Sequence, residues 1–536
     1  GVLLILRYKK LSIQAHAISR CHGIGEDNEI VFEGIISEVE IQTDSEKQPL
    51  LKIKCVASTY SMCLNRQFLI SENKKDSDIF NDLIDRYDIV AKGKVAQTSF
   101  EHPFIVQFGE TDWDFLLQRA NKIGHIVYFE NNQISVKKPN QGKTTLAVTF
   151  GTDIIRQQLT FSTKSIISEV KSRSWNPVDQ ALRTEISDKI DFPEPGDDSV
   201  SDSASLGEKF MQGSQTLLTH ADEDNGYLMD KARGQLLQYE LNKINGYVVV
   251  EGSHKPKLDS VLEINKLGRY FSGEGYISGV DHKVKDGKWT TKVHIGVPTD
   301  IFSSISTPSS HPLSSLQIGV IEQIHDDPEG NQRVLVSIPG FEAEGSGIWA
   351  RVLQWYTSAE AGNVFYPEVG TEVVLGYLSA DPQSPIVLGS LYNAKNIPPF
   401  DVEEANNIKA FISREKLSLT FDEEKKEILL ETPERNAITI SDDLGGIRLE
   451  DQHGNKLILD DAGITLESSS DLYLKAKGEL NVQAERGFSV KSRGDIKLEG
   501  MNLSSNANMK IEHKGNIVES NATAQMVIKG GIVQIN

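Results

Sequence analysis

The features of this sequence that could do chemistry are carboxylate and histidine side chains and glycine-rich turns. The stretch HADEDNGYLMD (220–230) gathers carboxylates that could bind calcium. It lacks the EF-hand register, in which spaced acids are followed by glycine and a distal glutamate. Carboxylates also favour the N-terminus of a helix, so the cluster predicts a helix entry. The twelve histidines include no HExxH motif and no pair at zinc spacing. We therefore expect no metal and no cofactor.

The glycine-rich turns give no stronger signal for an enzyme. CHGIGEDN (21–28) and SGEGYISG (272–279) contain Gly-x-Gly, but neither continues as GxGxxG into a helix, as dinucleotide binding requires. GSGIW (345–349) does not match the GxSxG nucleophile elbow. With 76 acidic residues in the chain, spacing alone selects no acid–base pair. The sequence predicts no catalytic residue.

Three aromatic residues, Trp349, Trp355 and Tyr356, could stack on a base or a sugar. Arg351 is the single basic residue among them, and the chain carries a net charge of −20. An acidic surface disfavours nucleic acid and anionic lipid, which both need a basic face. We expect no nucleic-acid partner, and we expect these aromatic rings to pack in a core or between subunits.

The cysteines and the N-terminal residues bear on where the protein is made. Cys21, Cys55 and Cys63 are an odd and sparse set without a CxxC motif, so we expect no disulfide framework and synthesis in a reducing cytoplasm. The opening GVLLILRYKKL has too short an apolar run for a signal peptide or a membrane span. A protein exported with this sequence would need another route.

The first 300 residues predict a mixed, mostly β region with two helices. Thr111 and Asp114 have the spacing of a capping box, and Gly124 lies where a helix should end. A hairpin should follow, with its turn at 131–132. The stretch YLMDKARGQLLQYELNK (227–243) predicts the second helix.

The composition divides the chain into five parts. IFSSISTPSSHPLSS is the clearest linker, and the five short strand candidates after it, with Gly, Pro and Asp turns between them, predict a small barrel, with the OB-fold as the leading candidate. The expected parts are a mixed region (1–300), a linker (301–315), an OB-fold domain (316–392), a connector (393–440) and a β-rich repeat region (441–536).

An eight-residue repeat marks the last part. Pairs of apolar residues, two positions apart, return every eight residues along most of the segment and alternate with charged residues and glycine. Alternation puts each pair on one face of a short strand, and a fixed period indicates a solenoid or fibrous β-structure. The paired residues are Ile464, Leu466, Leu472, Leu474, Leu480, Val482, Phe488, Val490, Ile496 and Leu498.

One eight-residue strip cannot enclose a core. Either one chain coils with several repeats per turn, or three chains wind together and each gives one wall of a prism; the period alone does not choose. A lone chain could not hide such an apolar seam, so we infer obligate oligomerisation. The chain ends in AQMVIKGGIVQIN, where Lys529 is the only ionisable side chain after Glu519. Such an uncharged end is either a core strand or a surface that needs a cap.

Several stretches resemble the VgrG family of type VI secretion spikes, which is similar to the fused hub and needle of contractile phage tails. HPFIVQFGETDWDFLLQRANKIGHIVYF is similar to the helix-and-hairpin motif of the hub, and GYISGVDHKVKDGKWTTKVHIG to the end of the hub region. The OB-fold module of the family is similar to three stretches, GVIEQIHDDPEGNQRVLVSIPGF, WARVLQWY and FYPEVGTEVVLGYLSADPQSPIVLGSLYN. The eight-residue repeats, or octads, resemble those of a triple-stranded β-helix. The resemblance covers essentially residues 1–536.

The resemblance implies a mainly β fold. It has a hub of β-barrels with a few helices (1–300), a small OB-fold barrel as neck, and a C-terminal trimeric, triple-stranded β-helix needle with an apolar tip. The ten repeat residues would then form the core of a homotrimer. The family also implies non-catalytic action as a spike that crosses a target membrane mechanically.

The resemblance further implies partners and a location. The hub would sit on a tube of Hcp-like hexamers, a PAAR-repeat protein would cap the tip, and effectors would be separate chains. By position at the end of the rod, the platform for the cap would be Ile528, Lys529, Gly530, Gly531, Ile532 and Val533. The protein would be assembled in the bacterial cytoplasm without a signal peptide and delivered outside the cell or into target cells.

This sequence departs from the needles of some phages, since about 45 residues between OB-fold and β-helix are too few for a lysozyme domain. We also expect no fused effector domain, so that any toxin is a separate chain. Three other functions stay open: the spike of a free extracellular contractile particle, a β-helical enzyme acting on cell wall or polysaccharide, and a trimeric adhesin or tail fibre. The enzyme would need longer turns and a charged groove, and the fibre would need a globular head.

Overall fold

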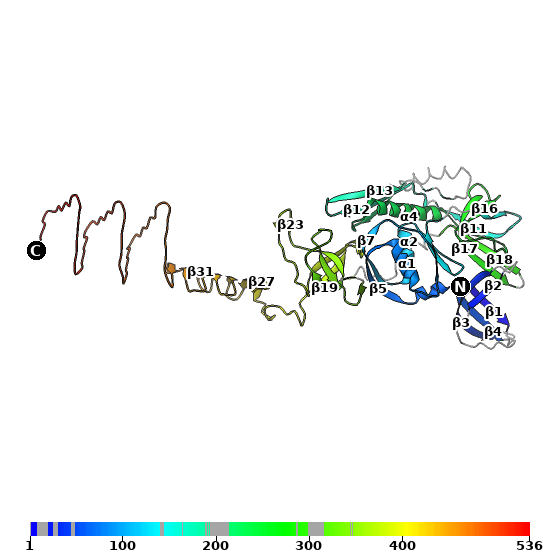
Figure 1. Cartoon of the computed structure of the whole chain (residues 1–536), viewed down its shortest axis with the longest axis horizontal. Helices are drawn as coiled ribbons and strands as arrows, with labels where there is room; N and C mark the ends of the chain where they lie inside the picture. Colours follow the sequence, from blue (N-terminus) through cyan, green and yellow to red (C-terminus); the bar gives the residue numbers. More distant parts are fainter. Residues whose placement is uncertain are drawn as a thin grey trace. The chain divides into compact units, whose positions relative to one another are not determined.

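The computed structural model divides into two compact units, residues 1–398 and 399–536, and most of the regular structure in the described parts is β-strand (Figure 1). The expected linker (301–315) lies outside the described residues. The structure describes residues 2–7, 20–24, 30–43, 49–139, 144–162, 165–187, 190, 192, 214–285, 288–297, 316–343, 345 and 347–535.

The first unit begins with a four-stranded sheet in the order β1-β4-β3-β2. Its strands are β1 (Val2–Arg7), β2 (Arg20–Ile24), β3 (Ile30–Thr43) and β4 (Pro49–Val56). Cys55 on β4 is fully buried and disulfide-bonded, whereas Cys63 is an exposed free thiol. The prediction of no disulfide framework did not anticipate a bond at Cys55, since an odd count of cysteines does not prevent one pair from forming.

The next region packs two helices against two small sheets. Its elements are η2 (Ser58–Cys63), β5 (Arg66–Lys75), α1 (Asp76–Asp85), β6 (Ala91–Val95), β7 (Glu101–Thr111), α2 (Asp112–Lys122), β8 (Ile126–Glu130) and β9 (Gln133–Lys137). The N-cap half of the predicted capping box is confirmed, because the Thr111 hydroxyl accepts from the Asp114 amide at 3.1 Å. Gly124 ends the helix with φ +69°, and the β8–β9 turn has φ of 50° and 60° at Asn131 and Asn132.

A six-stranded sheet, in the order β10-β16-β17-β18-β15-β11, forms the next core. Its strands are β10 (Thr144–Thr149), β11 (Ile154–Phe161), β15 (Ile244–Glu251), β16 (Val261–Asn265), β17 (Gly273–Lys285) and β18 (Lys288–Ile295).

The second predicted helix is confirmed as α4 (Asn225–Lys243). It packs on the sheet formed by β12 (Glu169–Asn176), β13 (Ala181–Ser187) and β14 (Ser214–Thr219). The acidic cluster before it is a helix entry, as predicted: the Asp224 carboxylate accepts from the Tyr227 amide at 2.7 Å, and Glu223 pairs with Lys231 at 2.9 Å.

The first unit also contains a closed barrel with the strand order β19-β20-β22-β26-β25. This five-stranded barrel is the predicted OB-fold, with β22 and β26 as a parallel pair and antiparallel neighbours elsewhere. Its elements are β19 (Gln317–Gln323), β20 (Val334–Ser337), β21 (Glu342–Ala343), β22 (Ile348–Val352), β23 (Thr357–Ser358), β24 (Ala361–Gly362), β25 (Glu372–Tyr377), η6 (Leu378–Ala380) and β26 (Pro385–Ser390).

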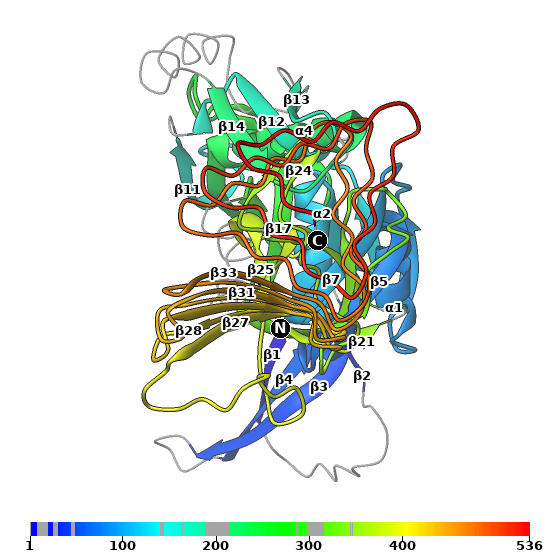
Figure 2. The same ribbon diagram turned by 90° about the vertical axis from the view of Figure 1, so that its left-hand side faces the viewer.

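The second unit contains one antiparallel sheet in which every strand pairs with the next in sequence. Figure 2 shows these strands lying one beside the next. The sheet runs without a break past residue 440, so the expected boundary between connector and repeat region falls inside it. The strands are β27 (Ile408–Ile412), β28 (Ser418–Asp422), β29 (Glu427–Glu431), β30 (Ala437–Ser441), β31 (Gly446–Glu450), β32 (Lys456–Asp460) and β33 (Gly463–Glu467).

Among the described residues, no helix is both long and apolar enough to span a membrane.

Candidate functional site: an apolar strip and a buried junction

The sheet of the second unit presents one continuous apolar face. The register of the strand pairing places apolar residues opposite one another. Each strand from β28 to β33 therefore adds two apolar side chains to the same face of the sheet. Ile428, Leu430, Ile438 and Ile440 are each 40–51% exposed. The paired residues are Leu419↔Leu430, Phe421↔Ile428, Ile428↔Ile440, Leu430↔Ile438, Ile438↔Leu449, Ile440↔Ile447, Ile447↔Leu459, Leu449↔Leu457, Leu457↔Leu466 and Leu459↔Ile464.

The opposite face of this sheet is largely polar. Thr420, Thr439, Arg448 and Thr465 occupy four of its central positions, Leu429 and Ile458 occupy two others, and charged residues lie at many strand ends. A sheet with one apolar and one polar face needs a second layer on the apolar side. Within the described part of this unit the chain supplies no such layer.

The predicted needle-core residues divide between the sheet and the stretch beyond it. Ile464 and Leu466 lie on β33 and continue the apolar face. The other eight lie in residues 468–535, a fully described stretch with no strand in it, which Figure 1 draws as a broad zig-zag. All eight are more than half exposed: Leu472, Leu474, Leu480, Val482, Phe488, Val490, Ile496 and Leu498.

This distal stretch therefore lacks both a core and backbone pairing within one chain. Burial of a large apolar side chain stabilises by roughly 1.5–3 kcal/mol, and backbone groups removed from water need hydrogen-bond partners. Other chains can supply both. The expected tip residues share this exposure, with Ile528 at 63%, Ile532 at 91% and Val533 at 52%; Lys529, Gly530 and Gly531 lie between them.

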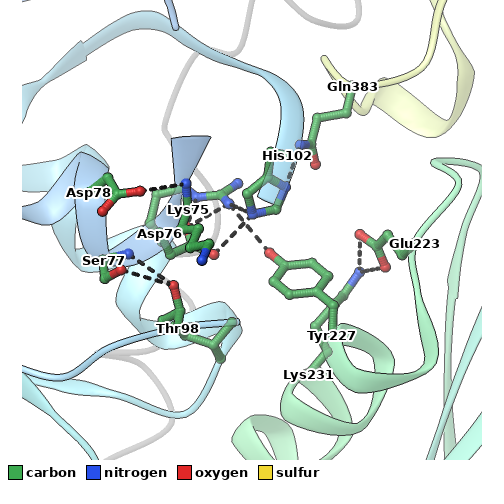
Figure 3. A network of polar contacts seen from close by, with 12 residues as sticks. Lys75, Asp76, Ser77, Asp78, Thr98, His102, Glu223, Tyr227, Lys231 and Gln383 are labelled. Atoms are coloured by element: carbon green, nitrogen blue, oxygen red, sulfur yellow. Dashed lines mark hydrogen bonds and ion pairs between the residues drawn. The ribbon is translucent and has the colours of Figure 1, made fainter. Parts of the chain in front are cut away.

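A buried polar network lies in the first unit (Figure 3). The Arg119 guanidinium on α2 binds Asp76 at the start of α1, with Nε to Oδ1 at 2.7 Å. His102 on β7 places Nε2 3.0 Å from Asp76 Oδ2. Arg119 also donates to the Tyr227 hydroxyl at 3.4 Å, and Figure 3 shows the Tyr227 side chain pointing from its helix towards His102. These four residues are at most 5% exposed.

The barrel completes this network. Gln383, just before β26, donates from Nε2 to His102 Nδ1 at 3.1 Å and to the Phe104 carbonyl at 3.2 Å. Thr219 also donates to Asp381 at 3.2 Å. The Arg119 guanidinium also approaches the ring, with Nη2 2.7 Å from Nε2, so His102 contacts Asp76 and Arg119 through Nε2 and Gln383 through Nδ1.

Apolar packing reinforces this contact between barrel and hub. Ile70, Phe104 and Phe108 of the β5–β7 sheet share one buried cluster with Ile321 and Leu375 of the barrel. The short strand β21 also pairs in parallel with β5, with Glu342 opposite Leu69. We call the polar network and this shared core together the hub–barrel junction.

Burial and charge set the protonation states in the network. Burial alone would raise the pKa of Asp76, but Arg119 and His102 lower it to about 2. Burial, with the nearby Arg119 charge, lowers the pKa of His102 to about 4. Burial raises the pKa of Tyr227 well above its usual value. At neutral pH, Asp76 and Arg119 are therefore an ion pair beside a neutral histidine and a neutral tyrosine.

An Asp–His pair can serve catalysis, but both ring nitrogens of His102 are engaged and its side chain is 1% exposed. The arrangement holds elements together and offers no surface to a substrate. No group of three metal-binding side chains occurs in the residues the structure describes. Of the aromatic residues considered from sequence, Trp349 is half-buried on β22, while Trp355 and Tyr356 are exposed.

Sequence reasoning missed this network. Asp76, His102 and Arg119 are single polar residues in three different elements, so no periodic pattern joins them. The sequence offers one signal for the network. Arg119 follows Leu116 by three positions, which places a charged residue on the apolar face of the predicted helix.

The hub, the closed barrel and the one-faced sheet define a protein of the class formed by phage baseplates and type VI injectors. Residues 317–392 match the type VI secretion system/phage-baseplate injector OB domain, and residues 427–491 match the phage baseplate V C-terminal trimerisation domain. Residues 13–286, just over half of the chain, match the Alg8 N-terminal domain, so the chain belongs to that family. The matches to the injector OB domain and to the baseplate trimerisation domain confirm the resemblance to the fused hub-and-needle family.

Curated relatives match over limited segments. The type VI secretion system spike protein VgrG2a of Pseudomonas aeruginosa is 37% identical over 98 residues, which are 18% of this chain and 11% of that protein. The actin cross-linking toxin VgrG1 of Vibrio cholerae is 22% identical over 57% of this chain and 29% of its own length. The matched segments thus span less than a third of these relatives.

Two solved structures are also similar. One is a type VI secretion component of E. coli, described as similar to bacteriophage tail proteins, with 11% identity, a TM-score of 0.45 and coverage of 73% of this chain and 91% of that one. The other is a Francisella PdpA–VgrG complex, with 13% identity, a TM-score of 0.44 and coverage of 81% and 67%.

Proposed function

We propose that this chain is the spike protein of a contractile injection system and acts as a homotrimer. The observation that carries the proposal is the apolar face of β28–β33 and its continuation to Leu498, which the described part of one chain leaves uncovered. Three such faces turned inward would bury one another as the walls of a prism. The match of residues 427–491 to a trimerisation domain supports this number of copies.

The partners follow from this role. The hub would dock on a tube of Hcp-like hexamers, and residues 528–533 would be the platform for a PAAR-repeat cap. Effectors would be separate chains, and the spike would cross the target membrane by mechanical force without catalysis. The protein would be assembled in the bacterial cytoplasm and delivered outside the cell or into target cells.

Two kinds of machine use such a spike, a type VI secretion system and a free extracellular contractile particle. The matched descriptions name both type VI secretion and phage baseplates. Fractionation of producing cells distinguishes them: a free particle would be recovered as whole sheathed assemblies, and a type VI spike would stay bound to a membrane-anchored complex until firing.

The absolute mass in solution tests the proposal. Light scattering on a sizing column should give about 178 kDa, three times the 59.4-kDa chain. A stable monomer would mean that the repeats are buried within one chain. The spike proposal would then fail, and a β-helical enzyme scaffold would become the better interpretation.

A further inference from the structure

An ordered hairpin leaves the barrel between β22 and β25. Its two short strands pair as Thr357↔Gly362 and Ser358↔Ala361, and Figure 1 shows β23 apart from the barrel strand β19. Amide side chains fix its base: Asn363 donates to Gln354 Oε1 at 2.6 Å and accepts from the Tyr356 amide at 2.8 Å. The conformation is therefore held by specific hydrogen bonds.

The same hairpin carries large apolar side chains in solvent. Trp355 is 80% exposed, Tyr356 61%, Val364 79% and Phe365 62%. The rings of Trp355 and Phe365 lie 6.3 Å apart, so they form one surface. A rigid, aromatic and largely uncharged projection has the composition of an interface centre. We call these four residues the hairpin patch.

A second apolar surface lies on the outer face of the barrel. Ile318 on β19 is 42% exposed and pairs with Val374 on β25. Leu388 on β26 is 38% exposed. Its side chain lies close to Gly376 on β25, since a Cβ atom placed on that glycine would be 3.1 Å from Leu388 Cδ1. Leu316 beside β19 is 65% exposed. Three neighbouring strands thus contribute to one apolar surface, the barrel patch of Leu316, Ile318, Val374 and Leu388.

Two different apolar surfaces are what a threefold ring requires. In a cyclic trimer each contact is heterologous, so one surface of a protomer meets a different surface of the next. The hairpin patch and the barrel patch are two such surfaces, whereas a twofold dimer would need one self-complementary patch.

The chain itself brings the patches of different copies together. The barrel ends at Ser390 and the one-faced sheet begins at Ile408. The 17 residues between them span at most about 61 Å when extended. If the sheets of three copies associate, each barrel is tethered near two others at an effective concentration in the millimolar range. Modest apolar patches then suffice for docking.

We propose that the hairpin patch of each protomer packs on the barrel patch of the next protomer in the trimer. This inference rests on the proposed trimeric spike and adds a specific contact in its neck. It gives the exposed Trp355 and Tyr356 a role in inter-subunit packing.

Cysteine cross-linking in the full-length chain tests the contact. In a Cys63→Ser background, Val364→Cys and Leu388→Cys together should give covalent dimers and trimers with a short bismaleimide. Each single substitution should give neither, because the contact joins two different surfaces. The matched control combines Val364→Cys with Val178→Cys, which replaces a 68%-exposed valine on the hub. It should not cross-link above the singles.

Light scattering on each variant separates the outcomes. A trimer in which the Val364→Cys/Leu388→Cys pair links no more than its controls overturns the hairpin contact and leaves the spike proposal standing. A monomeric parent chain overturns both. Cross-linking that depends on both cysteines in a trimer supports the contact.

Discussion

At the residue scale, His102 makes stability depend on pH. It is neutral in the folded chain because burial and Arg119 lower its pKa to about 4, whereas an unfolded histidine titrates near 6.5. Between these values the unfolded chain binds a proton that the folded chain does not, so unfolding becomes easier as the pH falls from 6.5 towards 4. Above pH 6.5 the full contribution is present.

We predict that acidification from pH 7 to pH 4 removes about 3 kcal/mol of unfolding free energy through this one group. The measurement is denaturant unfolding of the full chain at several pH values, compared with His102→Gln. The variant should show a flatter pH dependence, and His325→Gln, at an exposed surface position, should behave as the parent. Equal slopes in the parent and His102→Gln would contradict the assignment.

Single residues in the sequence predicted structure correctly only where the structure depends on residues close by in the chain. The Thr111 cap, the Gly124 helix end and the Asn131–Asn132 turn each depend on neighbours within a few positions, and all three are confirmed. The His102 contacts join residues 26 and 281 positions apart, and no local pattern encodes such a meeting.

At the element scale, the repeat was recognised only in part. An eight-residue register is found from Ile464 on, but the strands before it begin nine or ten residues apart up to β32. The turns between these strands are longer, so a search for an eight-residue period does not align them. Apolar and polar residues nevertheless alternate in these strands as they do in the later repeats. The needle-like sheet therefore starts at β27, within the expected connector.

We predict that Phe488→Asp prevents a stable needle. In a trimer it would bury three carboxylates in one layer, each costing several kcal/mol, so the thermal midpoint should fall by at least ~10 °C or the trimer should dissociate. Ser489→Asp is the matched control, because the neighbouring position points to the opposite face of a strand. Calorimetry and light scattering measure both effects. A Phe488→Asp trimer of unchanged thermal stability would refute the interpretation of the octads.

At the scale of the whole molecule, the two units differ in how they can be stabilised. Residues 1–398 contain several buried clusters, including the core shared by hub and barrel. Residues 399–536 leave most of their apolar side chains exposed in one chain. We therefore expect folding of the second unit to be coupled to association, so that its apparent stability rises with protein concentration. Composition and periodicity predicted this division, but the contacts between chains depend on three-dimensional surfaces that no repeat specifies.

The final prediction concerns the tip. Deletion of residues 528–536 should leave the trimer intact, because the apolar sheet and the octads lie upstream of it, and should abolish binding of a PAAR-type cap in a pull-down. Lys529→Ala is the control: it removes the only charged side chain after Glu519 but keeps the apolar surface of Ile528 and Ile532, so the cap should still bind. Capture of the cap by the truncated trimer would place the platform elsewhere, and loss of the trimer on deletion would mean that these last residues form part of the needle core.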